Sequence, residues 1–291
     1  MIFGSIPALV TPFSGNCVAE DSLRDFVEWQ IAEGSDALVP CGTTGEVATL
    51  DADEHRHVIA TVVEVAKGRV PVIAGTGTNS TAASIERTRA AADLGADAAL
   101  VVVPYYNKPS QAGLAAHFTA IAEASPIPIV VYNVPSRTVA DISVDTLAEV
   151  AKHPKIVAVK DATGSLGRVS AQRLKCGEDF IQLSGNDESA LAFNAMGGVG
   201  CISVSANVAP RLCSDFQKAM REGRWDDAAK LEGRLAPLHA ALFTDASPGP
   251  TKYALTRVRP GFPAELRLPL VEASDSSKRA VDAALEHAGL I

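Results

Sequence analysis

A lysine and a tyrosine in this 291-residue chain each stand at the end of a short apolar run. Lys160 follows the run 156–159, and Tyr132 ends the run 127–132. A lysine amine is almost wholly protonated in neutral water, so it becomes a nucleophile only where an apolar pocket disfavours its charge. With a tyrosine to move protons, such an amine could form a Schiff base. Lys160 could instead be a strand-end lysine that reaches into solvent, and Tyr132 could be an ordinary strand-end aromatic.

Other polar segments also follow apolar runs, and they could bind a substrate. Thr43 and Thr44 could hydrogen-bond a carboxylate together with exposed loop N–H groups, or they could serve only the turn chemistry around their flanking glycines. Arg137 could grip a second carboxylate through two parallel hydrogen bonds, although most arginines form solvated surface pairs. The polar segments are 42–46 (GTTGE), 104–107 (PYYN), 132–137 (YNVPSR), 160–164 (KDATG) and 184–187 (SGND).

Other kinds of site have weaker support. The six histidines are scattered and fit surface positions better than a metal site, and no zinc-protease, phosphate-loop or serine-hydrolase motif occurs. The segment 75–80 resembles a dinucleotide-binding loop, but Ser80 stands where the third glycine belongs. Cys41 lies beside the threonine pair, yet the sequence offers it no evident base. The chemistry is therefore expected from Lys160 and its neighbours.

Eight short apolar runs alternate with amphipathic stretches, which is typical of βα units around a parallel sheet. Apolar faces within 23–31 and 58–63 indicate two of the helices, and Gly68 and Gly95 stand where helices should end. Eight such units predict an α/β fold, a TIM (β/α)8 barrel whose active site lies at the carboxyl ends of its strands. The expected strands are 6–10, 37–40, 70–74, 98–103, 127–132, 156–159, 180–183 and 200–204.

The last part of the chain has a different pattern. Strand-like runs stop after Glu222, and the remainder is typical of helices interrupted at 247–250 (SPGP) and at the proline-bounded segment 260–269. We therefore predict a catalytic barrel domain over residues 1–223 and a C-terminal helical extension, packed on the barrel, over residues 224–291.

Composition and charge narrow the classes of function. The chain is 47% hydrophobic, which favours a folded globular protein. Its net charge of −8 repels nucleic acid. Five dispersed cysteines without a C-x-x-C pair fit a reducing compartment. The N-terminus lacks the basic start of a signal peptide, and no apolar run is long enough to cross a membrane. We expect a cytoplasmic protein that contacts neither nucleic acid nor membrane.

Four of the polar segments together resemble the 4-hydroxy-tetrahydrodipicolinate synthases, also called dihydrodipicolinate synthases, within the pyruvate-dependent Schiff-base lyases and aldolases. The resemblance implies that Lys160 forms a Schiff base with pyruvate, whose enamine adds to L-aspartate 4-semialdehyde in diaminopimelate and lysine biosynthesis. It covers essentially the whole chain. The segments that carry it are 42–46 (GTTGE), 105–109 (YYNKP), 132–138 (YNVPSRT) and 160–164 (KDATG).

The resemblance also implies a proton relay and an assembly. Tyr132, Thr43 and Tyr106 would form the relay, and Tyr106 would enter from a neighbouring subunit of a homotetramer made of two tight dimers. A lysine nucleophile and a tyrosine relay suffice for this chemistry, so neither a metal nor an organic cofactor is expected.

The same likeness implies how the two substrates bind. Thr44 would hold the carboxylate of pyruvate, and Arg137 would hold that of the semialdehyde. Gly185 and the backbone of Ile202 match positions that line the pocket. The two substrates are the small-molecule partners that this reading expects.

The resemblance also bears on a regulatory site. His55, Asn79 and Tyr105 match positions of an L-lysine site. Ala52 and Ala83, however, stand where lysine-sensitive relatives carry a histidine and a glutamate. Inhibition by L-lysine is therefore expected to be weak or absent.

Two alternative functions remain open at this point. N-acetylneuraminate lyase and the 2-keto-3-deoxy sugar-acid aldolases share the lysine, the tyrosine and a similar glycine–threonine loop, although the segment 136–138 (SRT) favours the synthase. A barrel that only binds a ligand is a more distant alternative. Such a protein would be expected to lose Lys160, Tyr132 or Arg137, and all three are present.

Overall fold

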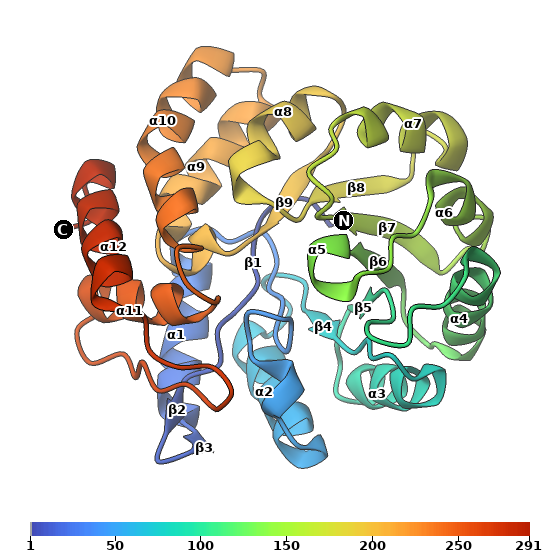
Figure 1. Ribbon diagram of the computed structural model, residues 1–291, viewed down its shortest axis with the longest axis horizontal. Coiled ribbons are helices and arrows are strands. Elements are labelled where there is room, and N and C mark those ends of the chain that lie inside the picture. The colour runs from blue at the N-terminus through green and yellow to red at the C-terminus, as the bar shows by residue number, and fades with distance from the viewer. Residues whose placement is uncertain (1) are drawn as a thin grey trace.

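The computed structural model describes residues 2–291 as a ring of strands surrounded by helices (Figure 1). Seven strands form one curved parallel sheet in the order β1-β9-β8-β7-β6-β5-β4. Their apolar sequences suit strands that are buried on both faces. The strands are β1 (Gly4–Pro7), β4 (Ile73–Gly75), β5 (Ala98–Val102), β6 (Ile129–Asn133), β7 (Ile156–Asp161), β8 (Ile181–Ser184) and β9 (Gly200–Ser203).

The expected strand 37–40 closes the ring between β1 and β4, although only isolated bridges join it to them. On one side, the Val39 N–H donates to the Pro7 carbonyl (3.0 Å), and the Leu9 N–H donates to the Val39 carbonyl (2.9 Å). On the other side, the Ile73 N–H donates to the Leu38 carbonyl (2.8 Å). The segment therefore occupies the eighth strand position, and the predicted α/β barrel is confirmed.

Helices cover the outside of this ring, as Figure 1 shows. Gly68 and Gly95 have the positive φ angles of 70° and 93° expected just beyond a helix end. The sequence patterns did not indicate the short α5 (Pro135–Thr138) or the hairpin of β2 (Phe13–Ser14) and β3 (Cys17–Val18). The other helices around the ring are α1 (Glu20–Ala32), α2 (Ala52–Ala66), α3 (Thr81–Asp93), α4 (Gln111–Ala124), α6 (Val144–Val150), α7 (Gly167–Cys176), α8 (Ala190–Ala195) and α9 (Pro210–Arg221).

Alternation along the strands decides which side chains enter the barrel. Successive side chains of a strand point to opposite faces. On β6, Val130 and Tyr132 belong to the cluster that fills the barrel, whereas Val131 packs outward under the helices. On β7, Ala158 belongs to the inner cluster and Val159 to the outer one. Lys160 lies two residues after Ala158, so its side chain points to the same face, inward, at the carboxyl end of the strand.

The C-terminal helices pack against one side of the barrel (Figure 1). They are α10 (Trp225–Ala241), α11 (Gly249–Val258) and α12 (Asp275–Ala288), and α10 contacts both α9 and α12. Their buried apolar residues belong to the same cluster as those of α1, α2 and α9. The expected helical extension is therefore confirmed, while the domain boundary between residues 223 and 224 stays a prediction.

The surface placement expected for the histidines is wrong for half of them. His55, His117 and His239 are buried, with exposed fractions of 2%, 6% and 5%. Burial is possible because each ring has a hydrogen-bond partner: the carbonyl of Gly75, the hydroxyl of Thr81 and the hydroxyl of Ser205, respectively. Sequence spacing alone gives no sign of these contacts, since each partner lies on a different element.

Acid should destabilise the protein through His117. This ring packs between α3 and α4, and burial lowers the pKa of His117 to about 4. The unfolded chain binds the proton near pH 6.5, so the stability due to the neutral ring is present above that pH and is lost as the pH falls towards 4. Between pH 7 and pH 5, the free energy of unfolding should fall in both proteins. The fall should be about 2 kcal/mol smaller for His117→Gln than for the wild type.

Urea unfolding at several pH values measures this difference. His57→Gln, a change at an exposed position, is the matched control and should follow the wild type. Parallel curves for His117→Gln and the wild type between pH 7 and pH 5 would show that His117 does not carry the effect.

Candidate active site

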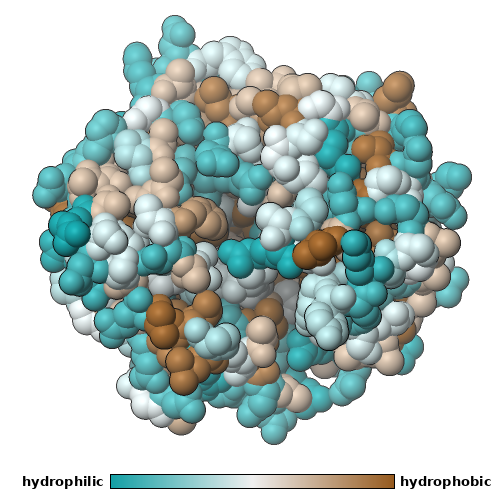
Figure 2. All heavy atoms as spheres, in the orientation of Figure 1, coloured by the Kyte–Doolittle hydropathy of each residue, from teal (hydrophilic) through white to brown (hydrophobic). Residues whose placement is uncertain are grey.

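A cavity of about 520 Å³ opens at the carboxyl ends of the strands. Figure 2 shows this face hollowed near its centre and surrounded mainly by hydrophilic side chains. The cavity brings together six of the predicted site residues, from five separate loops or strand ends. They are Thr43, Thr44, Tyr132, Arg137, Lys160 and Gly185.

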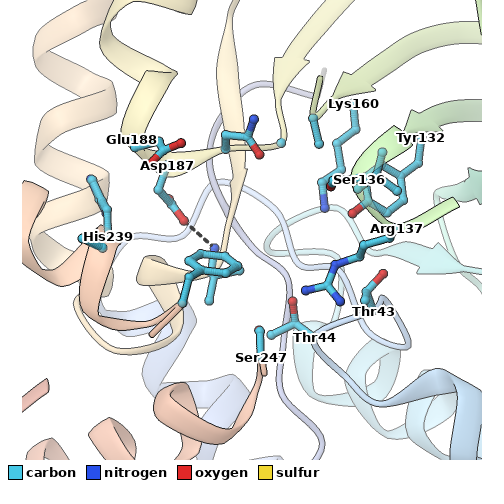
Figure 3. Close-up of a pocket in the computed structure, with 17 residues that line it drawn as sticks. Thr43, Thr44, Tyr132, Ser136, Arg137, Lys160, Asp187, Glu188, His239 and Ser247 are labelled. Carbon is cyan, nitrogen blue, oxygen red and sulfur yellow. Dashed lines mark hydrogen bonds between the residues drawn. The ribbon is translucent and has the colours of Figure 1, made fainter. Parts of the chain in front are cut away.

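Lys160 and Tyr132 lie side by side in the wall of this cavity (Figure 3). They are direct partners in the register of β6 and β7, and both side chains are 6% exposed. The Lys160 Nζ lies 4.1 Å from the centre of the Tyr132 ring. Within the described chain, Lys160 forms no ion pair with a carboxylate. The amine is thus buried against an aromatic ring and does not extend into solvent, which suits a Schiff-base nucleophile.

Asp161 fixes the strand end on which Lys160 sits. Its carboxylate is buried and accepts hydrogen bonds from the Thr163 N–H (2.9 Å), Arg168 Nε (3.1 Å) and Gln172 Nε2 (2.7 Å). Because neighbouring side chains of a strand point to opposite faces, Asp161 anchors β7 from outside while Lys160 points inward. In the sequence this aspartate stands out only as part of a polar segment, and nothing there indicates its anchoring role.

The Thr43–Thr44 turn lies at the start of the loop that follows the strand segment 37–40. The Gly45 N–H donates to the Gly42 carbonyl (3.1 Å), and Thr11 Oγ1 donates to the Gly45 carbonyl (2.8 Å). A Cβ atom on Gly45 would lie 2.9 Å from the Leu9 carbonyl oxygen, so this close turn requires glycine. Turn chemistry therefore shapes the loop, and it leaves both threonines facing the cavity.

Arg137 enters from the short helix α5, which begins with Pro135. Figure 3 shows its guanidinium group directed into the cavity, towards Thr43 and Thr44. Arg137 forms no ion pair with another described residue, so its fork of donors is free to bind an anion. A planar guanidinium of this kind suits a carboxylate.

The wall opposite Lys160 contains residues that the sequence did not single out, although Asp187 ends one of the polar segments. Asp187 and Glu188 follow β8, and His239 comes from α10 (Figure 3). Asp187 is buried and accepts hydrogen bonds from the N–H groups of Val204 (2.9 Å) and Ser205 (3.1 Å). Burial opposes a charge on His239, yet Glu232 and Asp187 raise the pKa of His239 above its ordinary value. The C-terminal extension therefore supplies part of the site.

Of the residues predicted for catalysis or substrate binding, two lie outside this set of cavity-lining residues. Tyr106 is 93% exposed and has a positive φ angle of 72°. Ile202 is fully buried in the barrel interior, where β9 pairs with Ile6 of β1. The relay role of Tyr106 and the pocket role of the Ile202 backbone stay predictions.

The three residues matched to an L-lysine site lie on the loops and the helix beside β4 and β5. His55 Nε2 donates to the Gly75 carbonyl (2.8 Å), and burial lowers the pKa of His55. Asn107 links the other two, because it lies two residues after Tyr105 and its Nδ2 donates to the Asn79 carbonyl (2.8 Å). Lysine binding by these residues stays a prediction.

Two further properties concern metals and membranes. Among residues 2–291, no group of three or more His, Cys, Asp or Glu side chains is placed to hold a metal ion. In the same described part of the chain, no helix is both long and apolar enough to cross a membrane. The expectation that neither metal nor organic cofactor is needed stays a prediction.

The barrel with its buried lysine suits a Schiff-base-forming lyase, and the comparisons show that class. The chain belongs to the dihydrodipicolinate synthetase family, whose sequence model matches residues 1–288. A relative from Rhizorhabdus wittichii, named 4-hydroxy-tetrahydrodipicolinate synthase, is 61% identical over 290 residues and covers 100% of both chains.

Solved structures extend the likeness to three dimensions. A dihydrodipicolinate synthase from Acinetobacter baumannii complexed with pyruvate matches with a TM-score of 0.97 and 44% identity over 100% of both chains. A structure described as the first monomeric dihydrodipicolinate synthase variant matches with a TM-score of 0.97 and 36% identity, covering 100% of this chain and 98% of that chain. The family resemblance seen in the sequence is thereby confirmed.

Proposed function

We propose that the protein condenses pyruvate with L-aspartate 4-semialdehyde to form 4-hydroxy-tetrahydrodipicolinate. The observation that carries this proposal is the buried Lys160 amine beside Tyr132 in a cavity with Arg137 and the Thr43–Thr44 turn. The names of the curated relatives support the same reaction. It would serve diaminopimelate and lysine biosynthesis in the cytoplasm.

The proposed lysine chemistry proceeds through an imine and an enamine. The Lys160 amine attacks the ketone carbon of pyruvate, and the resulting carbinolamine loses water to give an imine. Loss of a methyl proton converts the imine to an enamine, which forms the new carbon–carbon bond at the aldehyde carbon. The amine of the second substrate then attacks the imine carbon, which closes the ring and releases Lys160.

Each of these steps needs a proton to move, and we assign that transfer to Tyr132. Its ring lies 4.1 Å from the Lys160 Nζ, and Thr43 lines the same cavity. In the proposed relay Tyr106 comes from a neighbouring copy of the chain. Its 93% exposure in the single chain leaves this side chain available for such a contact. We infer a homotetramer of two tight dimers.

The two carboxylates are assigned to different groups of the site. Thr44 would hold the carboxylate of pyruvate near Lys160, and the Arg137 guanidinium would hold the carboxylate of the semialdehyde through two parallel hydrogen bonds. Gly185 lines the cavity beside Ala162, and the backbone of Ile202 would complete the floor. Because the two carboxylate sites lie on separate loops, the binding constants of the two substrates should respond separately to mutation.

Consumption of pyruvate by the purified protein tests the proposed function. Pyruvate is supplied with aspartate semialdehyde in one assay and with N-acetylmannosamine in another, and Lys160→Ala is the control. Turnover with the semialdehyde alone, lost in the control, is the expected result. Turnover only with the sugar would place the protein among the aldolases, and no turnover with either would favour the ligand-binding barrel.

L-Lysine should inhibit the reaction weakly or not at all. Ala52 and Ala83 offer no polar side chain at the two positions where sensitive relatives are expected to have one, and the His55 ring is already bonded to the Gly75 carbonyl. The measurement is the initial rate at increasing L-lysine with both substrates fixed. Complete inhibition at sub-millimolar lysine would refute this expectation.

A further inference from the structure

A fully buried ion pair joins the Thr43–Thr44 loop to the C-terminal extension. Glu46 Oε1 lies 2.6 Å from Lys252 Nζ, and neither side chain has any exposed surface. The two residues are 206 positions apart in the sequence, so sequence patterns gave no sign of the contact. A buried ion pair is costly to desolvate and is weak evidence for stability by itself. What the pair holds in place therefore matters more than the attraction alone.

The lysine end of the pair is rigidly held on α11. Lys252 Nζ also donates to the Glu265 carbonyl (2.6 Å) and lies 4.4 Å from the centre of the Phe13 ring. Burial lowers the pKa of Lys252, while the Glu46 carboxylate acts against that change. Ser247, two residues before α11, lines the active-site cavity (Figure 3). The element that carries Lys252 thus also contributes to the site.

The glutamate end of the pair belongs to the turn itself. The Glu46 N–H donates to the Thr43 carbonyl (3.1 Å), and Glu46 Oε2 accepts from the Arg267 N–H (3.1 Å). Glu46 has a φ angle of 55°, in the left-handed region that residues other than glycine rarely adopt. Its anchored side chain can hold that conformation. Movement of Glu46 would therefore move the threonine turn.

We propose that Glu46 and Lys252 are positioning residues, whose ion pair fixes the Thr43–Thr44 turn against the C-terminal extension in the geometry that pyruvate binding and proton transfer need. This inference rests on the proposed function. An apolar contact would suffice to pack the extension on the barrel. The positioning role explains why an ion pair joins them beside the Thr43–Thr44 turn.

The central test is the double variant Glu46→Gln/Lys252→Met. It removes both charges, so neither is left buried and unpaired. The kcat/KM for pyruvate should fall by about 10- to 100-fold, because small misplacements of reacting groups have effects of this order. The KM for pyruvate should rise and imine formation should slow. The KM for the semialdehyde should stay near that of the wild type, since Arg137 lies on a different loop.

A second variant keeps the test decisive if the double variant folds poorly. Glu46→Asp retains both charges but shortens the side chain by one methylene, and it should show the same pattern with a smaller effect. Leu255→Ala is the matched control, because Leu255 is fully buried on the same helix and takes no part in the ion pair. It should lower the melting temperature and leave the KM and the kcat/KM for pyruvate unchanged.

The outcomes separate this inference from the proposed function. If the wild type consumes no pyruvate, the proposed function itself fails. A second outcome is an active wild type together with a folded Glu46→Gln/Lys252→Met or Glu46→Asp variant that keeps the wild-type KM and kcat/KM for pyruvate. In that case the positioning role is wrong and the pair serves stability alone. An equal loss in Leu255→Ala would overturn it as well, because the effect would then follow destabilisation of α11.

Discussion

Replacing Lys160 with alanine should lower kcat/KM for pyruvate by about 10⁴-fold or more, the order of effect seen when the nucleophile of a covalent mechanism is removed. The alanine side chain cannot form an imine, so the enamine route is lost completely. Steady-state assays of pyruvate consumption, run at high enzyme concentration, measure the loss. The fold should survive, since Lys160 forms no ion pair with another described residue.

Two controls distinguish loss of the nucleophile from loss of structure. Lys160→Arg keeps a positive charge at the strand end but cannot form the same imine, so it should be as inactive as Lys160→Ala. Lys152→Ala, at an exposed position, should keep wild-type activity. Activity within tenfold of the wild type in either Lys160 variant would mean that another group is the nucleophile.

Tyr132→Phe should lower kcat by about 10²- to 10⁴-fold, the range typical of a lost general acid–base group. The change removes only the hydroxyl and keeps the aromatic ring that faces the Lys160 Nζ at 4.1 Å. Imine formation and release should both slow, because each needs a proton transfer. Single-turnover assays with pyruvate alone measure the first of these steps separately from carbon–carbon bond formation.

Tyr253→Phe offers a matched control for this change. The Tyr253 hydroxyl donates to Asp282 Oδ2 (2.9 Å) within the C-terminal extension, away from the cavity. The variant should lose some stability and keep full activity. Imine formation by Tyr132→Phe at the wild-type rate would contradict the relay role of Tyr132, even if overall turnover were lower.

The barrel could be predicted from the sequence because its strands are short, apolar and regularly spaced. Even the irregular strand 37–40 kept the apolar character that burial demands. Strand ends were less predictable: β1 ends at Pro7, and by Val10 the backbone N–H donates to the side chain of Asn207. That contact joins residues 197 apart, so local patterns could not reveal it.

The centre of the candidate site was also predictable, because a polar residue at the end of an apolar strand is a local feature. Lys160, Tyr132 and the Thr43–Thr44 turn are of this kind. His239 and Lys252 are not, since they reach the site or its support from helices of the extension, far along the chain. Their partners become clear only when the fold brings distant elements together.

Trapping the Schiff base tests the central claim most directly. The protein is incubated with pyruvate, reduced with borohydride, digested and examined by mass spectrometry. We expect one added group per chain, equal in mass to pyruvate less one water plus two hydrogens, on the peptide that contains Lys160. Addition at another lysine, such as the buried Lys252, or no addition at all, would contradict the assignment of Lys160 as the nucleophile.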